Sequence, residues 1–415
     1  MTKYSEFIHL KLPALLTSLV GVFPPQFIFE EDLKLRRIYH RYAKFILGWY
    51  VLVLASSYIE VCILCSEKPI RIEELCRNLA ITLIFTMTLI RHMFIKFKLE
   101  FRNMIEFVTN MEKSMKNITD KMIKKIYQDC AKTTRQQIII FMLGVLFMTV
   151  ITIGRPFYAK EVVQKGNETV LVKSFPLSVW MPFDKNAHFW ASYFINILYI
   201  TPGACFSIFT DILILALITF ATGQLKILHH VLENFELYKQ NMLKMEYRQR
   251  NDEVIAFILF RKCVNMHQDV IKYVNNFNNS MSMFMVYDFL QTSLQLTTII
   301  VQFIMIPDLD RQTQGYFVCF LIVELYRLLL LYYYANEICI LSESLPLSIW
   351  KSNWYEQSVE VQKMAKLMML NCKIPLKLKI GPFGYMTLGS FIAILKASYS
   401  YMMLIYNVNS LSQAS

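Results

Sequence analysis

Apolar side chains occur in long runs along most of the chain, and shorter polar stretches separate these runs. A helix needs about 20 mostly apolar residues to cross the hydrocarbon core of a bilayer. Seven segments approach or exceed that length, at residues 42–65, 73–95, 137–154, 186–225, 280–306, 312–335 and 383–409. The pattern predicts an all-α polytopic membrane protein with seven transmembrane helices.

The polar stretches between the spans have helical patterning of their own. Segments 102–136 and 224–277 place apolar residues at helical spacing, as at Ile105 and Val108, and neither contains a proline. We therefore expect spans four to seven to continue into the cytosol as a helical bundle. Gly381-Pro382 is expected to divide the last helix into a cytosolic piece and a membrane piece.

The distribution of Lys and Arg predicts the orientation, because cytosolic loops carry more of them than outer loops do. With a cytosolic N-terminus, the inner segments hold 33 Lys and Arg, including Arg91 and Arg327, and the outer segments hold 9. Lys396 lies within the last span. An odd number of spans then places the C-terminus outside the cell.

Composition agrees with a helical membrane protein and gives no sign of an enzyme. Hydrophobic residues make up 55% of the chain and charged residues only 18%, and 11 glycines are few for 415 residues. The net charge of +12 does not predict nucleic-acid binding, because the excess lies in the inner segments. Cys62 and Cys65 have metal-site spacing but no second pair accompanies them, so a structural role is expected. We expect no cofactor, no metal and no cleavable signal peptide, and no phosphate-binding glycine loop, His-Glu-x-x-His or serine elbow occurs.

Several polar groups need partners inside the membrane. Glu324 and Arg327 are three residues apart, so we expect them to pair. Asp211 and Asp288 are expected near the cytosolic ends of their spans, satisfied by water or by the cytosolic bundle, as anchors rather than ion-entry groups. His229-His230 is expected on a solvated helix face.

Three glycosylation sequons test the orientation. The sequons at Asn117 and Asn278 fall in cytosolic segments and should be silent. Asn167 falls in the outer loop between spans three and four and is a candidate acceptor.

The C-terminal fifth carries a specific resemblance. It contains "YYYANEI" at 332–338, "SIWKSNWY" at 348–355 and "IPLKLKIGPFGYMTLGSFIAILKASYSYMMLIYNV" at 374–408, and "MPFD" stands at 181–184 before span four. These resemble the aromatic turn, the tryptophan after span six and the last helix of the insect odorant receptor family. Length, span number and orientation are also similar over the whole chain.

The resemblance implies a tetrameric cation channel in the plasma membrane of an olfactory neuron dendrite. An odorant-binding subunit of this family assembles with a shared co-receptor, and the short loop between spans four and five resembles that of the odorant-tuning subunit. The partners implied are the co-receptor, a small volatile odorant, membrane lipid and permeant cations, with no nucleic acid. Ser400-Tyr401 and Asn407-Val408 also approximate the Thr-Tyr-x5-Gln-Phe ending of gustatory receptors, which leaves a homotetrameric gustatory-type channel as an alternative.

The resemblance also assigns parts to the chain. They are a cytosolic N-terminal segment (1–41), spans one to four with the ligand region (42–222), a cytosolic helical loop (223–279), spans five and six (280–338), cytosolic anchor helices (339–382) and a pore-lining last helix (383–415). In the last helix, Leu404, Asn407 and Val408 share a face and are the expected pore residues, two apolar gate positions around a hydrogen-bonding ring. Lys396 lies about 16 Å deeper, where a contact between helices is favoured over a pore vestibule.

The resemblance places the ligand in the outer half of spans two, three, four and six. A volatile molecule needs an apolar and aromatic site with few polar groups. The candidate residues are Leu79, Thr82, Leu83, Thr86, Phe147, Met148, Ile151, Thr152, Phe189, Tyr193, Phe194, Ile197, Tyr316, Cys319 and Phe320. Most of them would serve equally as core packing.

Two other protein classes remain as rivals. A G-protein-coupled receptor would have the opposite orientation, and the chain lacks that class's acidic-arginine-aromatic triplet after span three and its Asn-Pro-x-x-Tyr in span seven. A transporter would show inverted internal repeats, which are not visible here.

Overall fold

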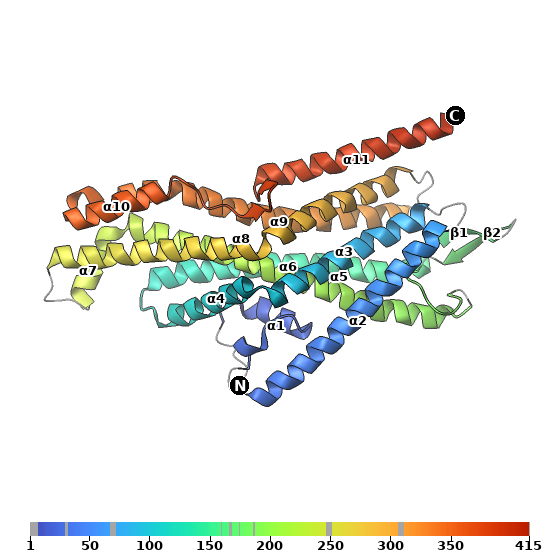
Figure 1. Cartoon of the computed structure of the whole chain (residues 1–415), viewed down its shortest axis with the longest axis horizontal. Coiled ribbons are helices and arrows are strands. Elements are labelled where there is room, and N and C mark those ends of the chain that lie inside the picture. Colours follow the sequence, from blue (N-terminus) through green and yellow to red (C-terminus); the bar gives the residue numbers. More distant parts are fainter. Residues whose placement is uncertain are drawn as a thin grey trace.

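A computed structural model describes residues 7–29, 32–66, 72–158, 160–165, 168–173, 175–185, 187–245, 251–305 and 311–414. Its N-terminal half contains α1 (Lys11–Leu19), a 3-10 turn (Pro25–Phe27), α2 (Leu33–Ser66), α3 (Ile72–Phe97), α4 (Leu99–Asn117) and α5 (Lys121–Tyr158). The C-terminal half contains α6 (Phe189–Glu233), α7 (Phe235–Met245), α8 (Asp252–Met305), α9 (Arg311–Lys351), α10 (Val359–Asn371) and α11 (Leu388–Ala414). Long helices run along one axis and form an elongated bundle (Figure 1).

Five of these helices are long and apolar enough to cross a membrane, namely α2, α3, α5, α6 and α9. Helix α8 is not among them, since its second half carries polar residues such as Asp288, Gln291 and Gln295, all of which are buried. The apolar stretch of α11 is shorter, covering Leu388–Leu404. The all-α, polytopic fold class is therefore confirmed, and the number of seven spans stays a prediction.

Helix α6 forms the centre of the bundle. Every residue from Thr210 to Leu225 is buried, as expected for a helix that is apolar all round. It packs against α5, α9, α8 and α3. Its 45 residues measure about 68 Å, roughly twice the hydrocarbon thickness, so the bundle continues beyond the membrane.

Helices α6 and α9 both extend beyond the spans expected from the sequence. Both helices pass without a break through the divisions expected at 222/223 and 338/339, so those divisions separate parts of one helix. At the far end His229 is half-buried, with Nδ1 2.6 Å from Ser348 Oγ and Nε2 2.8 Å from the Leu341 carbonyl oxygen. The expectation of a solvated His229 face is wrong, because the extension of α9 covers it.

Helix α11 lies at the edge of the bundle and packs on α8 and α9 (Figure 1). Ser398 Oγ donates to the Ser293 carbonyl oxygen at 3.1 Å, and Thr297 Oγ1 donates to the Ser398 carbonyl oxygen at 3.3 Å. A short hairpin of β3 (Lys379–Ile380) and β4 (Gly384–Tyr385) separates α10 from α11, with Gly381 at a φ of +47°. The expected break at Gly381-Pro382 is thus present.

The segment between α5 and α6 contains an antiparallel hairpin that the sequence did not predict. Strand β1 (Lys160–Lys165) pairs with β2 (Glu168–Lys173), and the register joins Lys165 to Glu168. The glycosylation candidate Asn167 lies outside the described residues.

Candidate ligand-binding site

A cavity of about 120 Å³ lies inside the bundle, between α3, α5, α6, α8 and α9. Its lining is apolar at one end and charged at the other. The lining residues are Ile81, Ile84, Phe85, Met87, Thr88, Arg91, Phe141, Val145, Met148, Thr149, Thr152, Ile200, Ala204, Ser207, Ile208, Asp211, Gln291, Gln295, Tyr316, Phe320, Val323, Glu324 and Arg327.

Aromatic and aliphatic side chains of α5 and α9 build the apolar end. Met148, Tyr316 and Phe317 belong to one buried cluster with Ile299 of α8. The ring of Phe320 stacks on that of Tyr316 with a centroid distance of 6.1 Å. Flat rings and a flexible thioether can fit a small apolar molecule closely.

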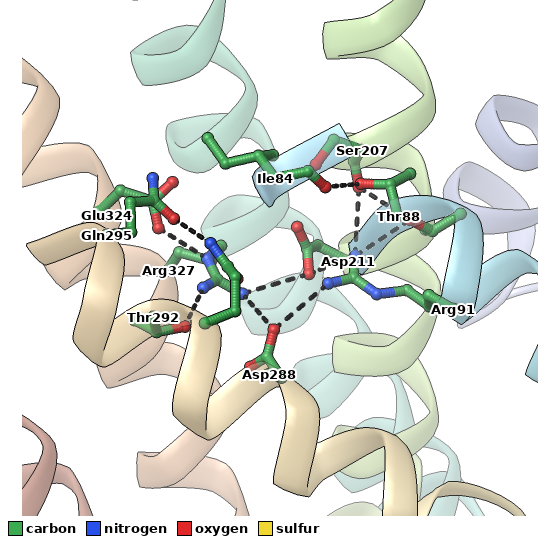
Figure 2. A network of polar contacts seen from close by, with 12 residues as sticks. Ile84, Thr88, Arg91, Ser207, Asp211, Asp288, Thr292, Gln295, Glu324 and Arg327 are labelled. Carbon is green, nitrogen blue, oxygen red and sulfur yellow. Dashed lines mark hydrogen bonds and ion pairs between the residues drawn. The ribbon is translucent and has the colours of Figure 1, made fainter. Parts of the chain in front are cut away.

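The other end of the cavity is a buried charge network (Figure 2). Arg91 of α3 contacts Asp211 of α6 at 2.6 Å, and Arg327 of α9 contacts Asp288 of α8 at 3.2 Å. Arg91 also lies 3.6 Å from Asp288, and Arg327 lies 3.6 Å from Asp211. Together with Glu324, three carboxylates face two guanidinium groups, so that four helices are joined at one depth.

Hydrogen bonds support this network. Arg327 Nε lies 3.0 Å from Glu324, and Arg327 Nη2 donates to Thr292 Oγ1 at 2.9 Å. Arg91 Nη1 donates to Thr210 Oγ1 at 3.0 Å. A buried ion pair offsets its desolvation only when further hydrogen bonds satisfy both partners. These bonds meet that need for Arg327, whereas Arg91 Nε has no acceptor among the described residues.

The network confirms one sequence expectation and corrects another. Glu324 and Arg327 pair as expected. Asp211 and Asp288 are buried and pair with arginines of other helices rather than with residues of the cytosolic bundle. Arg91 was expected to be one of the cations of a cytosolic loop, but its side chain is buried within the bundle.

Two donors at the cavity have no acceptor among the described residues. Gln295 Nε2 is one of them, and this residue is only 1% exposed. The Gln295 oxygen is already engaged, since it accepts a hydrogen bond from Gln291. Arg91 Nε is the other such donor. Buried donors nearly always have a partner, so both suggest a place for an acceptor inside the cavity.

Four of the fifteen expected ligand residues line the cavity, and they come from two helices. They are Met148 and Thr152 of α5 and Tyr316 and Phe320 of α9. Ile151 and Cys319 pack beside them without lining the cavity.

The four expected residues of α3 lie on another face of that helix. Thr82 Oγ1 donates to Asn78 Oδ1 at 2.9 Å, and Thr86 Oγ1 lies 2.8 Å from the Tyr58 hydroxyl of α2. Leu79 and Leu83 share this side and are half-buried. The face toward the cavity carries Ile81, Ile84, Phe85, Thr88 and Arg91 instead.

The expected residues of α6 belong to a separate aromatic group at its first turns. Tyr193 stacks on Phe189 with a centroid distance of 6.1 Å and meets Phe157 edge-on at 5.4 Å. Ile197 is half-buried nearby in the chain, and neither it nor this group lines the cavity. Phe147 and Phe194 are exposed on the outside of the bundle.

The expected pore residues lie near the end of α11. Leu404 is 64% exposed and Asn407 is exposed, while the side chain of Val408 lies outside what the structure describes. Lys396 is exposed as well, so within this chain it makes no buried contact between helices. Among the described residues, no group of three or more His, Cys, Asp or Glu side chains could hold a metal ion.

The residues that sequence reasoning missed are the polar ones of α8 and α3. Gln291, Gln295 and Arg91 all line the cavity. The sequence did carry a signal for the residues of α8. A run of glutamine, threonine and serine inside an expected span cannot hydrogen-bond to lipid tails, so these side chains are expected to face protein. Only the packing shows that this run and Arg91 face one another.

The chain matches a family and several proteins of known type. The family described as 7tm odorant receptor matches residues 71–399. Odorant receptor 30a of Drosophila melanogaster is 20% identical over 389 residues, covering 92% of this chain and 96% of the relative. Odorant receptor 10 of Aedes albopictus is 24% identical over 217 residues, covering 52% of this chain and 55% of the relative.

A solved structure shares the fold. The insect olfactory receptor OR5 from Machilis hrabei in complex with eugenol superposes with a TM-score of 0.74 and 14% identity, covering 96% of this chain and 97% of that chain. The same receptor without the stated ligand gives a TM-score of 0.72 at 15% identity.

Proposed function

Because the chain belongs to the 7tm odorant receptor family, we propose that it is a subunit of an odorant-gated, non-selective cation channel in the plasma membrane. The observation that supports this best is the cavity between α3, α5, α6, α8 and α9. It is lined by five helices and is apolar at one end, and its volume of about 120 Å³ is close to the roughly 150 Å³ of a cavity that binds benzene. The family resemblance implies the dendrite of an olfactory sensory neuron as the location.

The odorant binds with its apolar part against Met148, Tyr316 and Phe320 and its polar atom toward the charge network. Helix α8 connects this site to α11, because Gln291 and Gln295 line the cavity while Ser293 and Thr297 bond to Ser398. A shift of α8 on ligand binding therefore reaches the last helix directly.

The last helix lines the pore in this proposal. Leu404 points away from its own subunit's core, which suits a surface that four subunits turn toward a common axis. Leu404 and Val408 form apolar rings that block ions by dewetting, and Asn407 supplies a hydrogen-bonding ring. A co-receptor subunit contributes the other pore walls in a heterotetramer.

The test is to express the chain with and without an odorant co-receptor and to record current while a volatile panel is applied. We expect odorant-evoked cation current only in the presence of the co-receptor. Current from the chain alone would support the gustatory-type homotetramer instead. An N-terminal epitope tag accessible on intact cells would contradict both channel readings.

A cavity-filling substitution tests the site itself. Ala204→Phe places a ring in the cavity, so we expect the odorant concentration for half-maximal current to rise by about 10-fold or more, given the cost of overpacking. Phe194→Trp is the matched control, because Phe194 is exposed and lies outside the cavity. Equal effects of both variants would mean that odorants bind elsewhere.

A further inference from the structure

A second cavity, of about 280 Å³, lies where the segment after α1, the first turns of α2 and the α3–α4 junction meet (Figure 1). We propose that it binds the phosphate-bearing headgroup of an anionic phospholipid in the cytosolic leaflet. The proposal does not depend on the odorant site, because the two cavities share no lining residue.

The charge of this cleft favours an anion. His40, Lys44, His92, Lys96 and Arg102 line it, and no carboxylate does among the described residues. Lys44 and Lys96 are exposed and form no ion pair with any residue that the structure describes. Arg102 uses one nitrogen on Gln26 of the opposite wall, and its other guanidinium donors make no hydrogen bond to a described residue.

His92 gives an independent sign of a ligand. Its side chain is 3% exposed, and neither ring nitrogen has a hydrogen-bond partner among the described residues. The ring packs on Phe206 with a centroid distance of 5.3 Å, which fixes its position at the inner wall. Because buried polar atoms are almost always satisfied, a phosphate oxygen in the cleft is the partner that this N–H needs.

The surroundings favour a lipid over free phosphate. Three large apolar side chains that are close in sequence to lining residues are exposed. They are Leu19 (55%), Phe45 (71%) and Phe97 (72%). Lys44 stands near the start of the first expected span and His92 near the end of the second, at the level of the inner headgroups. Basic pockets at this level, next to exposed apolar side chains, fit an anionic headgroup together with its acyl chains.

The walls of the cleft are held in place without a ligand. Tyr42 Oη donates to the Leu19 carbonyl oxygen at 2.5 Å, and Tyr39 Oη donates to the Phe23 carbonyl oxygen at 3.0 Å. Gly21 has a φ of +73°, and a Cβ there would lie 2.7 Å from Ala43 Cα. Glycine therefore allows α2 to approach the segment after α1 closely enough to form the cleft.

The experiment measures binding of fluorescent dioctanoyl phosphatidylinositol bisphosphate to the full-length chain purified in detergent. The test variant is Lys44→Gln/Lys96→Gln, whose positions are exposed and form no ion pair with a described residue, so folding should be kept. Lys262→Gln/Lys272→Gln removes the same charge from exposed positions of α8 and is the control. Dioctanoyl phosphatidylcholine, inositol trisphosphate and inorganic phosphate serve as competitors.

We expect the dissociation constant to rise roughly tenfold or more in the cleft variant and to stay unchanged in the control, since each basic residue near a headgroup contributes about 1 kcal/mol. None of the three competitors should displace the probe at equal concentration. Absence of binding by the unmodified chain, equal losses in both variants, or displacement by phosphatidylcholine would overturn the proposal. Displacement by inositol trisphosphate or phosphate would replace the lipid by a free phosphate ligand and would also overturn it.

Discussion

At the residue scale, Gln295 is the lining residue that most clearly determines which ligand chemistry the cavity favours. Its amide nitrogen is buried without an acceptor among the described residues. An odorant with a carbonyl oxygen can satisfy it, whereas a hydrocarbon cannot. We predict that Gln295→Leu raises the half-maximal concentration of a ketone odorant by about 3- to 10-fold, the value of one hydrogen bond. A hydrocarbon of the same carbon number is the control, and a shift of equal size for both molecules would refute a hydrogen-bonding role.

The charge network makes a second prediction at this scale. Arg327→Leu leaves Asp288 and Glu324 buried without their main partner, so we expect a loss of about 3–5 kcal/mol in stability. Glu324→Gln removes the excess negative charge and keeps an acceptor for Arg327 Nε, so it should cost far less. The measurement is the temperature at which detergent-solubilised receptor loses its monodisperse peak. Equal losses for both variants would show that charge balance does not stabilise the network.

The residues of the charge network also show which contacts could be predicted from the sequence. The Glu324–Arg327 pair was predictable because both residues lie on one helix at a fixed spacing. The partners Arg91, Asp211 and Asp288 were not, because they come from three other helices whose relative rotation is set by packing.

At the element scale, α3 shows why a ligand face is hard to predict. Thr82 and Thr86 were expected to face the ligand, but Ile84 and Thr88 line the cavity instead. Each pair is offset from the other by two positions, which is more than half a helical turn. A span with apolar residues all round gives no contrast from which to choose a face. The five helices that are long and apolar enough to cross a membrane were predictable, because hydrophobic length requires no knowledge of neighbours.

The N-terminal segment yields a pH prediction for one element. His9 Nε2 lies 2.8 Å from the Ala216 carbonyl oxygen, and the adjacent backbone N–H groups donate to Glu112. Burial lowers the pKa of His9 to about 4, with the hydrogen bond to Ala216 acting in the opposite direction. A lowered pKa favours the neutral form, so docking is fully stable above the ordinary value of about 6.5 and weakens as the pH falls toward about 4.

Hydrogen–deuterium exchange of residues 8–19 measures that docking. Burial raises the pKa of Glu112, and its protonation on acidification favours the folded form, which opposes the effect of His9. The comparison is therefore with His9→Gln, which keeps a donor but does not titrate. We expect exchange in the unmodified chain to rise more steeply between pH 6.5 and 4 than in the variant. Parallel profiles would show that His9 does not couple docking to pH.

At the scale of the whole molecule, α8 joins three functions along about 81 Å of helix. Its second half lines the cavity, bears Asp288 of the charge network and bonds to α11. The polar residues of this half explain why α8, although it contains most of the expected span 280–306, is not among the described helices that are apolar enough to cross a membrane. Its polar groups face other helices rather than lipid, as the cost of unsatisfied groups in hydrocarbon requires.

The separation between cavity and last helix leads to the prediction that tests the whole arrangement. We predict that Leu404→Ser and Val408→Ser raise resting current or change ion selectivity, because a hydroxyl wets an apolar ring. The rank order of odorants should stay the same, since Leu404 does not line the cavity. Whole-cell recording with the co-receptor measures both properties. Ile392→Ser is the control, because Ile392 is exposed on α11 like Leu404 but lies about three turns earlier.

In the proposed heterotetramer the effect would be diluted, because co-receptor subunits would supply the remaining pore walls. A change in leak or selectivity without a change in ligand preference is therefore the informative result. Two outcomes together would show that the roles of the helices are exchanged. One is that Leu404, Asn407 and Val408 are all replaced with no change in conduction. The other is that substitution of Tyr193 or Tyr316 changes ion permeation, although both residues belong to the bundle and Tyr316 lines the ligand cavity.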